Sequence, residues 1–232
     1  MTRHHFTPSD PVTALVDADY NLLSFLSRFS LPLGFGNKTI RELCAEQGIS
    51  ADAFLLVVNF ALSGTVDRGQ LARVTPDEIA SFLRASHDYY LSYRFPHIRA
   101  NLLAAFDPAH ADINPIILNY FDRYIRRVEA HFRHEEEEVF PYIAALSGGH
   151  LDPDFDIARF ATSHDHDVED SLEEMKNIIL RYYTTGIPYR MYDVLIDIFN
   201  TEDDLTLHTR IEEELLVPKT AELEAELKNS AK

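Results

Sequence analysis

The pattern of apolar and polar positions along the chain is helical almost throughout. Apolar residues recur three or four positions apart, and no convincing segment has the alternation of a half-buried strand. The first such stretch covers residues 12 to about 30. Thr39 and Glu42 then form a capping-box pair that predicts the start of a short helix, and Gly48 is placed to end it. We therefore expect a small helical domain over residues 1–70.

Four longer helices are predicted from residue 75 onward. The first begins at Thr75-Pro76-Asp77-Glu78, which combines a capping Thr, a Pro at the first helical position and a Glu three residues after the Thr. The other three are expected over residues of about 114–146, 154–183 and 189–228. Pro96 should kink or split the first helix, and Pro218 should bend the last. Long helices with short connections predict an all-α, up-down four-helix bundle over residues 75–232.

One group of polar residues occurs twice in these helices, at a spacing of 77 residues. His87 returns as His164, each within a Ser-His-Asp triplet. The motif His-x-x-x-Glu at His131 and Glu135 returns at residues 208 and 212. Each half of the repeat thus supplies two histidines and one glutamate. Four imidazoles and two carboxylates are a suitable ligand set for two metal ions.

Helix geometry places these residues on faces that should point into the bundle. Successive residues turn by about 100°, so His131 and Glu135 lie one turn apart and can reach one point. The same face carries the apolar residues Ile117, Tyr124, Val128 and Tyr142. A Glu on a core face is costly unless it is paired or bound to metal. The other glutamates of the runs 135–138 and 212–214 are expected to be solvated.

The helix predicted over residues 154–183 offers two candidate ligands, His164 and His166. They lie about 200° apart around the helix axis, so one bundle interior cannot use both. His164 shares its face with apolar residues and matches His87 in the repeat, so we expect His164 to be the ligand. The predicted metal ligands are therefore His87, His131, Glu135, His164, His208 and Glu212.

The mixture of ligands favours iron. Imidazole suits Fe, Zn, Cu and Ni, whereas bridging carboxylates suit paired hard ions. Carboxylate pairs inside helix bundles are typical of di-iron and di-manganese centres, and the high share of imidazole favours iron. The simplest arrangement is a non-haem di-iron centre in which each iron ion binds two histidines, while Glu135 and Glu212 bridge the ions. Both ions would keep open positions for an oxo group, O₂ or NO. The pattern assigns no catalytic residue.

Charge and composition exclude several classes of function. The net charge is −17, from 21 basic and 38 acidic residues, and this argues against nucleic acid as the main partner. The sequence contains no run of 18 apolar residues, so it predicts no transmembrane helix. The first residues lack the apolar segment of a signal peptide. The lone Cys44 excludes an internal disulfide and suits a reducing compartment. We therefore expect a cytoplasmic protein without a membrane anchor.

The ligand pattern resembles the hemerythrin-like bundle. More closely, it is similar to the repair-of-iron-centres di-iron family, also described as regulators of cell morphogenesis and NO signalling. That family carries His, His-x-x-x-Glu, His, His-x-x-x-Glu, with a phrase like Leu-Phe-Pro after each Glu. Here Val139-Phe140-Pro141 and Leu216-Val217-Pro218 fill that place. The resemblance implies a di-iron centre linked to recovery of iron–sulfur clusters after nitrosative or oxidative damage, with damaged iron–sulfur proteins as partners. Hemerythrin proper uses an additional His that this pattern does not supply.

The N-terminal unit departs from the family pattern. The family has a Cys-Cys-Gly-Gly turn, but Gly34 and Phe35 stand where the two cysteines would be, and only the later Cys44 matches. Thiol chemistry of that pair cannot be transferred to this chain. Three functions therefore compete: a di-iron stress-response protein that repairs clusters or donates iron, a hemerythrin-like O₂ or NO sensor, and a structural bundle with core histidines. A homodimer is among the expected assemblies.

Overall fold

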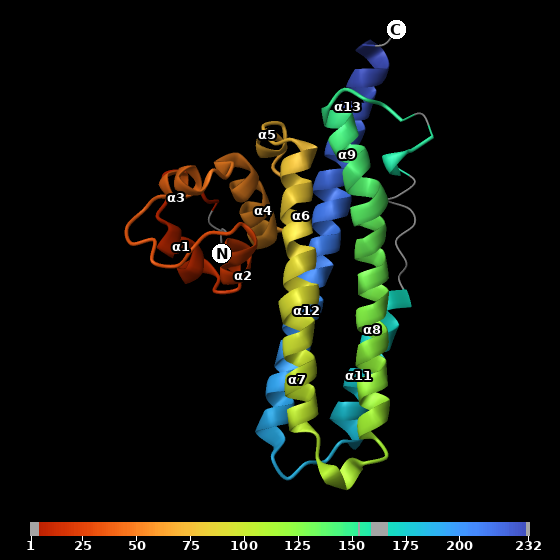
Figure 1. The fold of residues 1–232 in the computed structure, drawn as a ribbon. Coiled ribbons are helices and arrows are strands. Elements are labelled where there is room, and N and C mark those ends of the chain that lie inside the picture. The colour runs from red at the N-terminus through yellow and green to blue at the C-terminus, as the bar shows by residue number, and fades with distance from the viewer. Residues whose placement is uncertain (1–4, 153, 159–166, 231–232) are drawn as a thin grey trace. The chain divides into compact units, whose positions relative to one another are not determined.

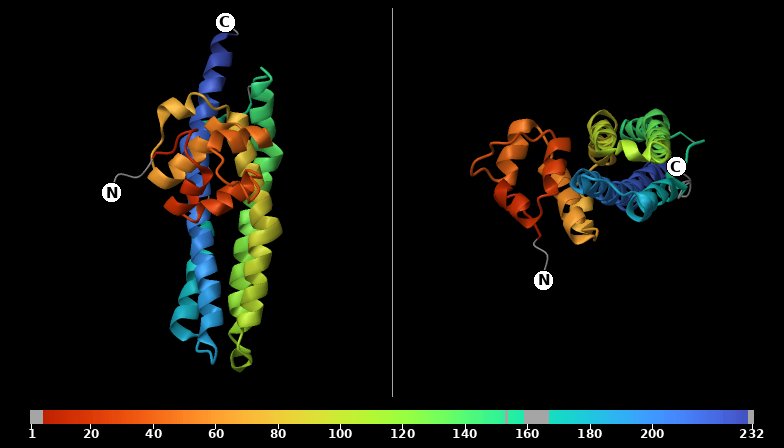
Figure 2. Two further views of the ribbon diagram at one scale, coloured as in Figure 1. Left: turned by 90° about the vertical axis from the view of Figure 1, so that its left-hand side faces the viewer. Right: turned by 90° about the horizontal axis from the view of Figure 1, so that it is seen from below.

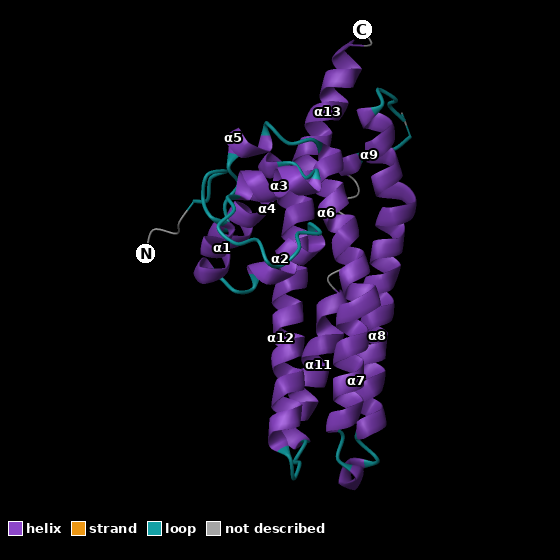
Figure 3. Ribbon diagram, turned by 60° about the vertical axis from the view of Figure 1, so that its left-hand side comes forward, coloured by secondary structure: helices purple, strands orange, loops and turns teal. Residues whose placement is uncertain are grey.

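The structure, a computed structural model, describes residues 5–152, 154–158 and 167–230. Within these ranges the chain is helical with no strand (Figures 1 and 3). Pro11 and Thr39 form an isolated β-bridge. The all-α prediction is confirmed. The residues form two compact units: one contains residues 1–86, 140–158 and 207–232, and the other contains residues 87–139 and 159–206. No helix in the described part of the chain is long and apolar enough to span a membrane.

Short helices make up the N-terminal part of the first unit. They are α1 Val12–Ala18, α2 Leu22–Arg28, α3 Ile40–Gln47, α4 Ala51–Ser63 and α5 Arg68–Leu71. The capping box is present, because the Thr39 hydroxyl accepts the Glu42 N–H while the Glu42 carboxylate accepts the Thr39 N–H. The single helix expected up to residue 30 is instead divided into α1 and α2. It is interrupted at Asp19, whose side chain accepts the N–H of Asn21 at 2.9 Å in a local turn.

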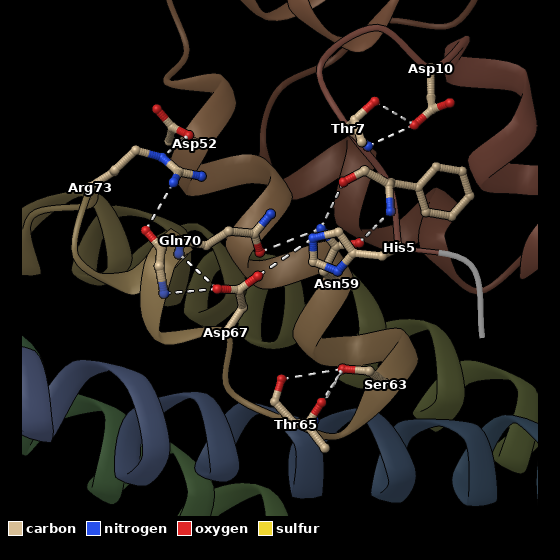
Figure 4. A network of polar contacts seen from close by, with 12 residues as sticks. His5, Thr7, Asp10, Asp52, Asn59, Ser63, Thr65, Asp67, Gln70 and Arg73 are labelled. Atoms are coloured by element: carbon tan, nitrogen blue, oxygen red, sulfur yellow. Dashed lines mark hydrogen bonds and ion pairs between the residues drawn. The ribbon is translucent and has the colours of Figure 1, made fainter. Parts of the chain in front are cut away.

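Polar contacts attach the start of the described chain to α4 (Figure 4). The buried Asn59 side chain accepts the N–H of Phe6 at 2.8 Å and donates to the Phe6 carbonyl at 3.0 Å. Asp67 caps α5 by accepting the N–H groups of Gly69 and Gln70. The Asn59 contacts satisfy buried backbone groups of Phe6 that would otherwise lose their water partners.

Aromatic residues of α2 and of the turn that follows it pack on α6 (Pro76–Asp88). Phe82 of α6 stacks on Phe29 with ring centroids 4.8 Å apart and on Phe25 at 5.6 Å. The Arg28 guanidinium lies over Phe25 and Phe82, so this buried cation faces aromatic rings. The sequence predicts a domain boundary between residues 70 and 75, and this boundary stays a prediction.

Among its described residues, the second unit has four α-helices around one hydrophobic core. They are α7 Phe95–Ala105, α8 Asn114–His134, α11 Asp167–Tyr182 and the part of α12 (Pro188–Ile211) up to residue 206. Both views of Figure 2 show these helices side by side. Their buried residues include Ile98, Leu102, Ile117, Phe121, Tyr124, Val128, Phe132, Leu172, Met175, Ile179, Val194 and Ile198. The predicted four-helix arrangement is confirmed.

The two loops at one end of this unit are joined by hydrogen bonds. The Asp107 carboxylate accepts the N–H groups of Ala109 at 2.9 Å and Gly186 at 3.3 Å. The Tyr183 hydroxyl accepts the Asp107 N–H at 2.6 Å and donates to Asn114 at 2.7 Å. The backbone donors at Ala109 and Gly186 lower the pKa of Asp107, since they stabilise its charged form. The loop before α8 is thereby fixed to the loop before α12.

In the part of the chain that the structure describes, three π-helical segments interrupt the long helices, and each precedes a proline. They are η1 Tyr89–Arg94, η3 Glu135–Val139 and η4 Glu212–Leu216. The helices that follow them, α7, α9 (Phe140–Ser147) and α13 (Val217–Ser230), each have Pro as their second residue. The Val217 N–H, for example, bonds to the carbonyl of Glu212, five residues back.

Proline chemistry explains these wider turns. Proline lacks an N–H, and in an α-helix its ring clashes with the carbonyl of the residue four positions earlier. That residue lies inside the π segment in each case: Ser92, Glu137 and Glu214. A π turn spaces these groups more widely, so the helix continues past the proline. The interruptions predicted at Pro96 and Pro218 therefore take the form of π turns.

Candidate metal centre

Four of the six predicted ligands lie together. His87, Glu135, His208 and Glu212 each offer a ligand atom, and these atoms all lie within 4.8 Å of one another. All four side chains are buried, and the two glutamates are 0% exposed. His87 comes from the end of α6, His208 from α12, and the glutamates begin η3 and η4. Four of the six residues that the repeat selects in sequence are thus neighbours in space.

Glu135 lies beside two histidines. Its Oε2 atom is 3.1 Å from Nε2 of His87 and 3.7 Å from Nε2 of His131. The His131 side chain is 29% exposed and does not belong to the buried group of four. His131 therefore lies next to the cluster, one helical turn before Glu135, at its more accessible edge.

The second His-x-x-x-Glu motif forms a tighter pair. Nε2 of His208 lies 2.6 Å from Oε1 of Glu212, and both side chains are almost fully buried. Their spacing of four residues on continuous helix places them on one face, as the sequence predicts. His164, the predicted ligand of the third helix, and its alternative His166 lie outside the described residues.

His87 is held by two neighbours that sequence reasoning missed. Its ring stacks on Phe132 with centroids 3.9 Å apart and planes inclined by 14°. Its Nδ1 atom lies 3.0 Å from Oε1 of Glu136. We expected Glu136 to be a solvated member of an acidic run, and that expectation is wrong: this side chain is 34% exposed and contacts His87.

The repeat extends to an irregularity that periodicity alone does not predict. Glu135 and Glu212 are each the first residue of a π segment, so η3 and η4 are separated by the same 77 residues as the ligands. The sequence feature that could have indicated these π segments is a Pro six residues after each Glu, at Pro141 and Pro218. Such π turns are frequent at functional sites.

The chemistry of the clustered side chains fits a transition-metal ion. A buried carboxylate is costly unless a cation or hydrogen-bond donors face it, and here two carboxylates share one interior. Imidazole nitrogens with carboxylate oxygens suit Fe, Zn, Cu and Ni. Three other histidines lie in surface ion pairs outside the buried group: His5 with Asp67, His97 with Asp197 and His134 with Glu138.

The fold and the site together define an all-α bundle with a buried group of histidines and glutamates that could hold a cation. Residues 78–220, more than half of the 232-residue chain, match the family model described as the hemerythrin HHE cation binding domain. The chain belongs to the hemerythrin family. The matched segment includes the four clustered residues and His131. No match was found among curated proteins.

Proposed function

We propose that this protein is a non-haem di-iron protein of the nitrosative and oxidative stress response. In this role it repairs damaged iron–sulfur clusters or donates iron to them. The observation that carries the proposal is the buried group of His87, Glu135, His208 and Glu212 within a hemerythrin HHE domain. Repeated ligands from equivalent helix positions suit two ions better than one, because each half supplies a similar set.

The proposed ligands would have two different roles in binding the metal ions. His87, His131, His164 and His208 would be terminal nitrogen ligands, and the carboxylates of Glu135 and Glu212 would bridge the two ions. Bound iron would supply affinity for O₂ or NO and a capacity for electron transfer. The buried walls around Glu135 and Glu212 would limit access of water, whereas the partly exposed His131 marks the more accessible edge of the cluster.

The repair role rests on similarity of the ligand register to the repair-of-iron-centres family. Support includes the proline phrase after each Glu, which coincides here with a π turn. A thiol mechanism has no support in this chain, since Gly34 and Phe35 replace the cysteine pair. Cys44 is 1% exposed, and burial raises the pKa of its thiol to about 11. Any repair activity would therefore reside in the metal centre.

A hemerythrin-like sensor of O₂ or NO is the second candidate. The absence of the cysteine pair favours it, because a module that only binds a diatomic ligand needs no thiol chemistry. Both candidates share the metal centre and the diatomic ligand, and they differ in turnover. For both candidate functions we propose a cytoplasmic location, and a homodimer remains an expected assembly.

Metal analysis and turnover assays test the proposal in sequence. Protein purified without air should contain about two iron atoms per chain and show a visible spectrum that changes on adding O₂ or NO. Iron-loaded protein should then restore activity to a nitrosylated iron–sulfur enzyme. Reversible binding of NO without cluster restoration would select the sensor. A protein without stoichiometric metal would exclude both and leave a structural bundle.

A further inference from the structure

We propose that Glu136 is a positioning residue for the metal centre. Its carboxylate accepts the Nδ1–H of His87, which leaves the Nε2 lone pair of His87 to bind a metal ion beside Glu135. This inference rests on the proposed metal-binding function, and it assigns a role to a residue outside the six expected ligands.

The contacts around the His87 ring carry the proposal. The two ring nitrogens face two different carboxylates: Nδ1 is 3.0 Å from Oε1 of Glu136, and Nε2 is 3.1 Å from Oε2 of Glu135. Phe132 covers one face of the ring at a centroid distance of 3.9 Å. These contacts fix both the position and the rotation of the imidazole. Glu136 lies on the outer side of the ring, and the Nε2 atom lies on the side of the buried cluster.

The two consecutive glutamates that reach one histidine both lie in the π turn η3. In an α-helix, neighbouring side chains diverge by about 100°, which sends them to different faces. Glu135 and Glu136 both lie in η3, where the wider turn reduces this divergence. Glu135 is fully buried, while Glu136 is partly exposed at the edge of the site. The next residue, Glu137, is exposed.

Physical chemistry gives Glu136 two effects on metal binding. Imidazole binds a metal through one neutral nitrogen while the other carries the proton, and the partner of the N–H selects the tautomer. A carboxylate partner also raises the basicity of the ligating nitrogen and holds the ring in the binding orientation. Loss of such a partner typically weakens metal affinity by about 10- to 100-fold.

The matched experiment compares three variants. Glu136→Ala removes the acceptor, Glu136→Gln keeps an oxygen acceptor without the charge, and Glu137→Ala removes a charge from the same acidic run without altering the His87 contact. Anaerobic competition with a chromogenic Fe²⁺ chelator measures the affinity of each. We expect a loss of about 10- to 100-fold for Glu136→Ala, a smaller loss for Glu136→Gln, and wild-type affinity for Glu137→Ala. Apo-protein melting curves should be alike for all of them.

A second readout follows the proton directly. In wild-type protein loaded with diamagnetic Zn²⁺ and labelled with ¹⁵N-histidine, long-range NMR correlations should show His87 protonated at Nδ1 and metal-bound at Nε2. Metal bound at Nδ1 would overturn the proposal, as would Glu136→Ala with wild-type Fe²⁺ affinity or with a loss equal to that of Glu137→Ala. If wild-type protein binds neither metal, the proposed function itself fails. A failure restricted to the Glu136 variants leaves the proposed function intact.

Discussion

Glu135 and Glu212 are equivalent in structure as well as in sequence: each is fully buried, and each is the first residue of a π-helical segment. Each also lies close to a buried histidine, at 3.1 Å from His87 and 2.6 Å from His208 respectively. Two carboxylates in one apolar interior are unfavourable on their own account, since each loses its hydration. Their presence at matching buried positions is the strongest physical argument for a cation between them.

Removing both carboxylates should abolish metal binding. We expect about two iron atoms per chain in wild type and almost none in a Glu135→Ala, Glu212→Ala double variant, because only these residues can bridge two ions in the proposed arrangement. Elemental analysis of protein purified without air measures the content. The double variant Glu137→Ala, Glu213→Ala, at exposed positions of the same runs, is the control and should keep its iron. Full metal content in the Glu135/Glu212 variant would contradict the ligand assignment.

Single histidine variants should distinguish the histidines that bind metal from those that do not. His164→Ala should lose iron and His166→Ala should retain it, since only His164 matches His87 in the repeat. His131→Ala should also lower iron retention, although less than His208→Ala, because the His131 side chain is 29% exposed and that of His208 only 1%. Iron retained during dialysis against a chelator is the measurement. Loss of iron in His166→Ala alone would show that the predicted helix phase is wrong.

The sequence predicts the features of this protein that depend on local chemistry or on the repeat. The capping boxes at Thr39 and Thr75 involve residues three apart, so their signal is complete within one turn. The buried histidines and glutamates follow from two equivalent halves. The π turns were missed because an assumed period of 3.6 residues hides a single wider turn. Glu136 was missed because its contact with His87 joins residues 49 positions apart, which local periodicity does not reveal.

Cys44 should behave as an inert core thiol. Burial raises its pKa from 9.0 to about 11, so the reactive thiolate is scarce at neutral pH. The folded protein should react with a thiol reagent at pH 8 far more slowly than the chain unfolded in urea, and the single cysteine makes the signal unambiguous. Because the folded pKa is the higher one, this burial stabilises the fold below about pH 9, and the contribution is lost as the pH rises toward 11. Rapid labelling of folded protein would contradict the buried position.

The loop contacts of Asp107 should make the fold sensitive to acid. Its pKa is lowered from 3.8 because two backbone N–H groups donate to its carboxylate. A lowered folded pKa means that the stabilisation is present above pH 3.8 and is lost as the pH falls through the folded pKa. Asp107→Ala should therefore melt lower than wild type at pH 7, and the difference should shrink in acid. Asp112→Ala, at an exposed position of the same loop, is the control and should melt like wild type. An undiminished difference below pH 3 would show that charge is not the cause.

Removing the metal should destabilise the protein. Metal that binds only the folded chain stabilises it by mass action, by about 2.7 kcal/mol when free metal is 100 times the Kd. For a domain of this size, that corresponds to a rise in Tm of roughly 5–10 °C. Without metal, the buried carboxylates of Glu135 and Glu212 belong to one cluster, so the apo protein also bears their repulsion. Calorimetry on the apo and iron-loaded forms at neutral pH measures the difference. The Glu135→Ala, Glu212→Ala variant should lose this metal-dependent rise. Equal melting temperatures for apo and iron-loaded wild type would mean that no metal binds among these carboxylates, and the proposed centre would be refuted.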